Sequence, residues 1–155
     1  MLLAGVAAIA AIVAGCGSSD DDSTQSTADN APTKPEFIKA ADAICKQGDG
    51  EIEAGFEKFA EENNIPRNQE PSDAQGVEIV ETVIVPNIQT QSELIRGLGA
   101  PEGDEKEVDQ LLDSLDEAIE AAEEEPKDLL AEGTSPFGDV NQEAVDYGLR
   151  VCGQE

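Results

Sequence analysis

The chain of 155 residues carries 9 basic and 35 acidic residues, which gives a net charge of -26 at neutral pH. Such a charge repels phosphate groups, so it excludes non-specific binding to nucleic acid and argues against adsorption to anionic lipid headgroups. The sequence contains no histidine and only three cysteines, which disfavours a Cys/His metal site. Hydrophobic residues make up 39% of the chain, enough for one modest core in a single domain.

The chain begins with an uncharged apolar run, residues 1–13, that ends at Val13-Ala14-Gly15-Cys16. A bilayer span needs about 20 apolar residues, whereas the apolar core of a signal peptide needs about 7 to 15. We therefore predict a signal peptide. Because its usual basic n-region is missing, we expect the true start codon to lie upstream of Met1. The alternative is a cytosolic protein that starts with an apolar strand or core helix.

The segment Val13-Ala14-Gly15-Cys16 resembles the lipobox of bacterial lipoproteins, whose obligatory cysteine is lipidated. The resemblance implies that residues 1–15 are removed and that Cys16 carries a covalent diacylglycerol, with no other cofactor. It also implies a lipid anchor at the extracytoplasmic face of the cell membrane.

Residues 16–32 follow the apolar run and contain almost no apolar side chains. Burial could not offset the entropy lost in ordering them, so we predict a disordered acidic tether. Random-coil scaling gives this tether a reach of roughly 20 to 25 Å.

Apolar residues then recur at helical spacing, so residues 33–155 are predicted to form an all-α domain. We expect the first helix to start at a capping box of Thr33 and Glu36 and to run to about Asn63. Gly48-Asp49-Gly50 marks either a bend in this helix or the close approach of another backbone. The expected core face comprises Phe37, Ala41, Ile44, Ile52, Phe56 and Phe59.

The second predicted helix starts at a capping box of Ser72 and Gln75 and ends at Gly97 or Gly99. Its β-branched run, residues 80–85, favours a strand as the alternative. We prefer a helix because a lone strand would have no partner. Pro86 cannot donate a hydrogen bond to the Thr82 carbonyl, so a kink is predicted there.

A third helix is predicted to follow a capping pair of Asp104 and Glu107, and Pro126 should stop it. We expect one helical turn at residues 128–131, and then a short last helix capped by Ser135 or Asp139. The third helix carries an acidic face, which suggests a calcium site, but carboxylates along a straight helix diverge. We therefore interpret it as a solvated face comprising Glu105, Asp109, Asp113, Asp116, Glu120 and Glu123.

Four helical segments with short connections predict a small antiparallel helical bundle. If Cys16 carries lipid, one pair of cysteines remains, and export would place it in an oxidising compartment. We predict a Cys45–Cys152 disulfide that joins the first helix to the last. Two buried, unlinked thiols are the alternative.

Four segments resemble a family of small, largely uncharacterised surface lipoproteins of actinobacteria. They are residues 37–45, 85–88, 103–105 together with Val108, and 147–153. The resemblance covers nearly all of the domain. It implies that Cys45 pairs with Cys152 and that the protein lies on the outer leaflet of a single plasma membrane, and it implies no activity.

The sequence predicts no catalytic residue, because it has no histidine and the abundance of its carboxylates makes any one pair uninformative. We therefore expect a binding or structural module of the cell envelope, not an enzyme, whose partner is an unidentified ligand or envelope protein. The alternatives are a small extracytoplasmic enzyme that uses carboxylates and an ion- or solute-binding module. A binding module predicts an apolar groove between helices, beside Pro86.

Overall fold

The computed structural model describes residues 31–131, 133 and 135–154. The predicted signal peptide, Cys16 and nearly all of the predicted tether lie outside the described residues. Within them, every regular element is a helix, which confirms the all-α prediction. The preferred prediction of a helix at residues 80–85 is confirmed, and the alternative of a strand is wrong, because the chain is helical throughout this run.

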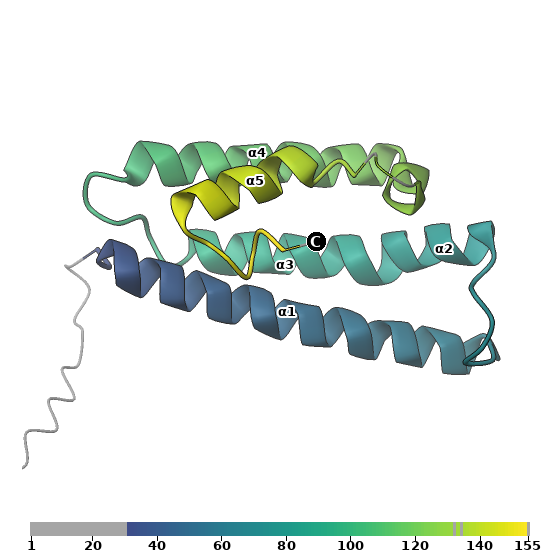
Figure 1. Cartoon of the computed structure of the whole chain (residues 1–155). Coiled ribbons are helices and arrows are strands. Elements are labelled where there is room, and N and C mark those ends of the chain that lie inside the picture. Colours follow the sequence, from purple (N-terminus) through teal and green to yellow (C-terminus); the bar gives the residue numbers. More distant parts are fainter. Residues whose placement is uncertain (1–30, 132, 134, 155) are drawn as a thin grey trace, which may run out of the picture. The chain divides into compact units, whose positions relative to one another are not determined.

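The helices lie side by side in antiparallel order (Figure 1). Helix α1 (Lys34–Glu62) packs against a rod formed by α2 (Asp73–Ile79), η1 (Val80–Ile84) and α3 (Val85–Arg96). The other side of α3 contacts α4 (Glu105–Glu124), which is followed by the 3₁₀ turn η2 (Pro126–Leu130). Helix α5 (Gly138–Tyr147) packs on α4, and the chain then turns back towards α1 and α3.

Two of the three predicted capping pairs are present. The Glu36 carboxylate accepts hydrogen bonds from Thr33 N and Oγ1, and Gln75 and Ser72 bond each other reciprocally. The third pair is wrong: Asp104 occupies the N-cap position of α4 but makes no side-chain capping bond there. Its carboxylate instead contacts residues of other helices, because Lys34 and Tyr147 lie beside it.

Helix α1 is continuous across its glycines, which excludes the predicted bend and favours the close approach. A side chain at Gly48 would collide with the Gln91 amide of α3, so this glycine lets the two helices pack tightly. The prediction that Phe56 lies on the core face is wrong, because its side chain is 38% exposed. Helix α1 packs mainly on α3 and η1.

Pro86 is accommodated by a π-helical turn. Residues 80–84 form η1, and the Val85 backbone N–H donates to the Val80 carbonyl, five residues earlier. A widened turn of this kind supplies the slack that the proline ring needs when it cannot donate to the chain. The predicted irregularity therefore lies in the turn before the proline, and the helix continues to Arg96 with Gly97 as its C-cap.

The last helix starts between the two predicted N-cap residues. Neither Ser135 nor Asp139 is the N-cap of α5, because that position belongs to Phe137, which is buried in the core. Burial of this aromatic ring fixes the point at which the chain enters α5. Gly148 ends the helix in the left-handed conformation, with a φ of 117°, a common C-terminal signal.

Candidate functional site

A cavity of about 440 Å³ lies among α1, η1, α3, α4, η2, α5 and the C-terminal segment. We call it the interhelical cavity. Its volume falls within the range of small-molecule sites in proteins, about 300 to 1,000 Å³. Its walls are mainly aliphatic. Several of the apolar lining residues are only half-buried, so the cavity reaches the surface; these are Ile52, Ile84, Ile88, Leu115, Leu129 and Val151.

The cavity arises from unequal helix lengths. Helix α1 has 29 residues and α4 has 20, but α5 has only 10. At a rise of about 1.5 Å per residue, α5 covers roughly 15 Å of a groove bounded by a helix of about 44 Å. Figure 1 shows that α5 extends along only part of α4. The cavity wall is completed by η2 and by segments outside the helices.

One wall of the cavity is held in place by a disulfide. Cys45 of α1 is bonded to Cys152, with 5.1 Å between the Cα atoms and a sequence separation of 107, and both residues line the cavity. The structure thus contains the predicted Cys45–Cys152 bridge.

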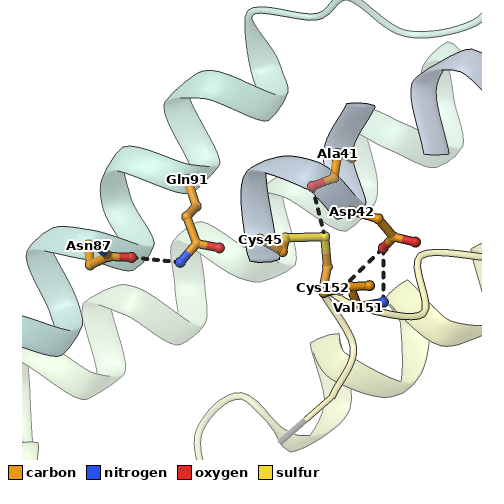
Figure 2. Close-up of a disulfide and its surroundings, with 7 residues drawn as sticks. All are labelled: Ala41, Asp42, Cys45, Asn87, Gln91, Val151 and Cys152. Carbon is orange, nitrogen blue, oxygen red and sulfur yellow. Dashed lines mark hydrogen bonds between the residues drawn. A yellow bond between two sulfur atoms is a disulfide. The ribbon is translucent and has the colours of Figure 1, made fainter. Parts of the chain in front are cut away.

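Asp42 reinforces this wall (Figure 2). Its Oδ1 accepts hydrogen bonds from the backbone N–H groups of Val151, at 2.9 Å, and Cys152, at 3.4 Å. The Cys152 Sγ also lies 3.5 Å from the Ala41 carbonyl oxygen. This last approach is a packing contact, because a disulfide sulfur has no proton to donate. Asp42 and the disulfide together hold the C-terminal segment on α1.

A chain of polar side chains crosses from α1 to α3 beside the cavity. The Glu51 carboxylate accepts from Gln47 Nε2, at 2.8 Å, and from Asn87 Nδ2, at 3.2 Å. Asn87 Oδ1 in turn accepts from Gln91 Nε2, at 2.7 Å (Figure 2). Gln91 lies over Gly48 and lines the cavity.

An empty apolar cavity lowers the stability of a folded protein. Unfilled apolar volume in a folded protein costs about 24 cal/mol per Å³, so a closed cavity of this size would cost at most about 10 kcal/mol. Typical domains have only about 5 to 15 kcal/mol of total stability. The opening to solvent reduces this cost, but water gains little against aliphatic walls. An apolar occupant would therefore stabilise the domain.

A separate polar cluster ties α1, α4 and α5 together at one end of the bundle. Tyr147 donates its phenol proton to Asp104 Oδ2, at 3.0 Å, and Lys34 Nζ lies 3.2 Å from the same oxygen and 3.8 Å from the Tyr147 ring centroid. The contact with Lys34, and then the bond from Tyr147, lower the pKa of the Asp104 carboxyl. Burial, and then the bond to Asp104, raise the pKa of the Tyr147 phenol well above 10.0.

The acidic face of α4 is exposed. Arg96 of α3 neutralises part of it, with Nη2 at 2.6 Å from Asp116 Oδ2 and Nη1 at 3.9 Å from Asp113 Oδ1. The buried Ser92 hydroxyl also donates to Asp116, at 3.0 Å. In the part of the chain that the structure describes, no three acidic or sulfur side chains are grouped as a metal site would require.

The structure brings together two of the three predicted site residues, Cys45 and Cys152, whereas Cys16 lies outside the described residues. Sequence analysis did not identify Ile88, Gln91 or Leu115 as site residues. Their signal was ambiguous, because apolar residues on an inner helical face indicate a core as readily as a cavity. Gly48, which faces Gln91, was the one sequence signal that another segment lies close to this part of α1.

None of the described helices is both long enough and apolar enough to cross a membrane. Comparisons with protein-family models, with curated proteins and with solved structures gave no match.

Proposed function

We propose that this protein is a lipid-anchored extracytoplasmic lipoprotein that binds a small apolar ligand in the interhelical cavity. The observation that carries the proposal is a cavity of about 440 Å³ with aliphatic walls in a domain of modest size. Ile84 and Ile88 line the cavity, whereas Pro86 between them lines a smaller hollow with Glu81 and Gln89, so the cavity does not open at the proline itself.

Binding accounts for these features better than catalysis does. An enzyme that works with carboxylates needs a pair of them shielded from water, with the pKa of one raised. Among the described residues, the only buried polar or charged side chain is Ser92, and its hydroxyl is bonded to Asp116. Of the residues that the structure describes at the cavity, Asp49 alone is ionisable, and it is exposed.

The disulfide supports an extracytoplasmic location, because disulfides persist in oxidising compartments. The lipobox-like segment Val13-Ala14-Gly15-Cys16 supplies the proposed anchor. Intact mass spectrometry of protein extracted from its native membrane fraction tests both. We expect loss of residues 1–15, a lipid adduct on Cys16, and two thiols that can be alkylated only after reduction. An unprocessed chain with three free thiols would refute the anchor.

Ligand binding is tested with a neutral apolar dye, N-phenylnaphthylamine, whose fluorescence rises in an apolar site. We expect the wild type to bind it and Ile88→Trp to lower its affinity about tenfold or more, because the larger ring occupies cavity volume. Leu94→Trp is the matched control, since Leu94 is on α3 but 51% exposed and does not line the cavity. Equal affinity of the two variants would contradict this site.

A further inference from the structure

The polar side chains at the interhelical cavity indicate which kind of apolar ligand it takes. We propose that the ligand is a single alkyl chain that ends in an uncharged hydroxyl group, and that the cavity discriminates against a chain that ends in a carboxylate. This inference rests on the proposed function and concerns the polar end of the ligand. It depends on the direction of the hydrogen bonds between Glu51, Asn87 and Gln91.

The direction of this hydrogen-bonded chain is fixed at its outer end. An ionised carboxylate only accepts hydrogen bonds, so Glu51 requires Asn87 to turn its amide nitrogen outwards. Asn87 then has only its Oδ1 to offer to the next residue, and Gln91 must donate to it through Nε2. The Gln91 carbonyl oxygen is therefore directed away from Asn87, as Figure 2 shows. Gln91 lines the cavity, and its carbonyl oxygen, which accepts no side-chain hydrogen bond from a described residue, is the acceptor that we assign to the ligand.

Negative charge favours the same ligand as this acceptor does, a hydroxyl group over a carboxylate. Among the described residues, Asp49 is the only charged one that lines the cavity, and it is negative. The whole protein carries a net charge of -26, so an anionic ligand is repelled both at the site and during its approach. A hydroxyl group can donate to Gln91 or to Asp49, whereas a carboxylate offers no proton to either.

The other polar lining residues do not discriminate between the two head groups. Ser135, Asn141 and Gln154 are uncharged, and their side chains can donate as well as accept. Selection therefore comes from the fixed acceptor and the negative charge.

The volume favours one chain over two. If each methylene group takes a share near the 30 Å³ of a water molecule, then the 440 Å³ cavity holds roughly 15 such groups. One medium-length chain fits this volume, and a lipid with two long chains does not.

The test compares decanol with decanoate, which have equal chain length, as competitors of bound N-phenylnaphthylamine at neutral pH on the oxidised protein. We expect decanol to displace the dye at a concentration about tenfold lower than decanoate, the ratio that corresponds to the loss of one hydrogen bond. Equal or stronger competition by decanoate would overturn the head-group inference and leave the apolar site standing. Failure of the dye and of both chains to bind would refute the proposed function and this inference together.

Two variants identify the origin of the selectivity. Asp49→Asn removes the negative charge at the cavity, so decanoate should compete better relative to decanol than it does in the wild type. Glu51→Gln lets position 51 donate, which allows the amides of Asn87 and Gln91 to reverse. The ratio of the decanoate concentration to the decanol concentration needed to displace the dye should then fall.

Glu53→Gln is the control for Glu51→Gln. It makes the same change in net charge at an exposed α1 residue that forms no side-chain hydrogen bond or ion pair with any described residue. A ratio that narrows equally in Glu51→Gln and Glu53→Gln would show that charge alone acts, and would overturn the role of the hydrogen-bonded chain.

Discussion

Two glycines of α1 lie two residues apart in opposite surroundings. Nothing lies within 4 Å of where a Gly50 side chain would begin, whereas at Gly48 that atom would collide with the Gln91 amide and approach Asn87 Oδ1 to 2.9 Å. Gly50→Ala should raise the free energy of unfolding by about 0.5 to 1 kcal/mol, because alanine favours the helix and nothing is displaced.

Gly48→Ala should instead lower the free energy of unfolding, because Gln91 must leave its hydrogen bond to Asn87. The displaced amide would also enter the cavity, so the affinity for an apolar dye should fall. Urea denaturation of both variants measures the difference, which we expect to be about 1 to 2 kcal/mol. Equal stabilisation by both would show that α3 does not constrain α1 here.

Asp104 gives the domain a pH-dependent contact. Lys34, and then Tyr147, lower the pKa of this carboxyl below its usual value of 3.8. A lowered pKa in the folded state means that the contribution of Asp104 to stability is fully present above pH 3.8 and is lost as the pH falls through the folded-state pKa. Asp104→Asn should therefore lower the melting temperature at neutral pH.

The gap between the melting temperatures of Asp104→Asn and the wild type should close as the pH falls well below 3.8. Circular dichroism at neutral and acidic pH measures it. Asp109→Asn, at an exposed α4 position that contacts no cation among the described residues, controls for the removal of one charge from an acidic protein. A gap that persists unchanged in acid would mean that Asp104 does not act through its ionised form.

At the scale of elements, α5 depends on its attachment to α1. Ten residues form a helix that is marginal alone, and the Cys45–Cys152 bridge closes a loop of 107 residues around it. In the chain-entropy model, such a loop is worth about 4 to 5 kcal/mol. A Cys45→Ser/Cys152→Ser double variant should lose up to this amount in denaturant unfolding, and amide exchange should rise first in α5.

The same unfolding experiment can refute the stabilising role of the disulfide. If the oxidised wild type and the double variant unfold at the same denaturant concentration, then the bridge does not stabilise the bundle. Asp42 and the packing of Phe137 would then be sufficient to hold α5 and the C-terminal segment.

The starts of the first two helices were predictable because their signals are local. Thr33 with Glu36 and Ser72 with Gln75 each form a capping box within four residues, and nothing elsewhere in the fold competes for them. Asp104 was mispredicted for the opposite reason: Lys34 and Tyr147 arrive from distant parts of the chain and take its carboxylate. The π turn before Pro86 was only partly predictable, since the sequence indicates an irregularity and not its form.

At the scale of the whole molecule, the sequence predicts the bundle and the disulfide but not the cavity. Periodicity shows which residues of each helix face inwards, and it shows nothing about how far α5 extends along the others. The cavity follows from that length mismatch and from the path of the chain after Gly148. The helical pattern therefore assigns inward-facing residues such as Ile88 and Leu115 to the core, whereas the structure places them in the wall of the cavity.

The central claim is that the interhelical cavity binds an apolar chain, and methyl NMR during a titration with decanol tests it most directly. We expect the methyl signals of Ile84, Ile88 and Leu115 to shift in a saturable way, because these side chains line the cavity. The methyls of the exposed Leu94, outside the cavity, should stay in place. If the lining methyls do not move, or if Leu94 moves with them, then the chain does not enter the cavity and the proposed function is wrong.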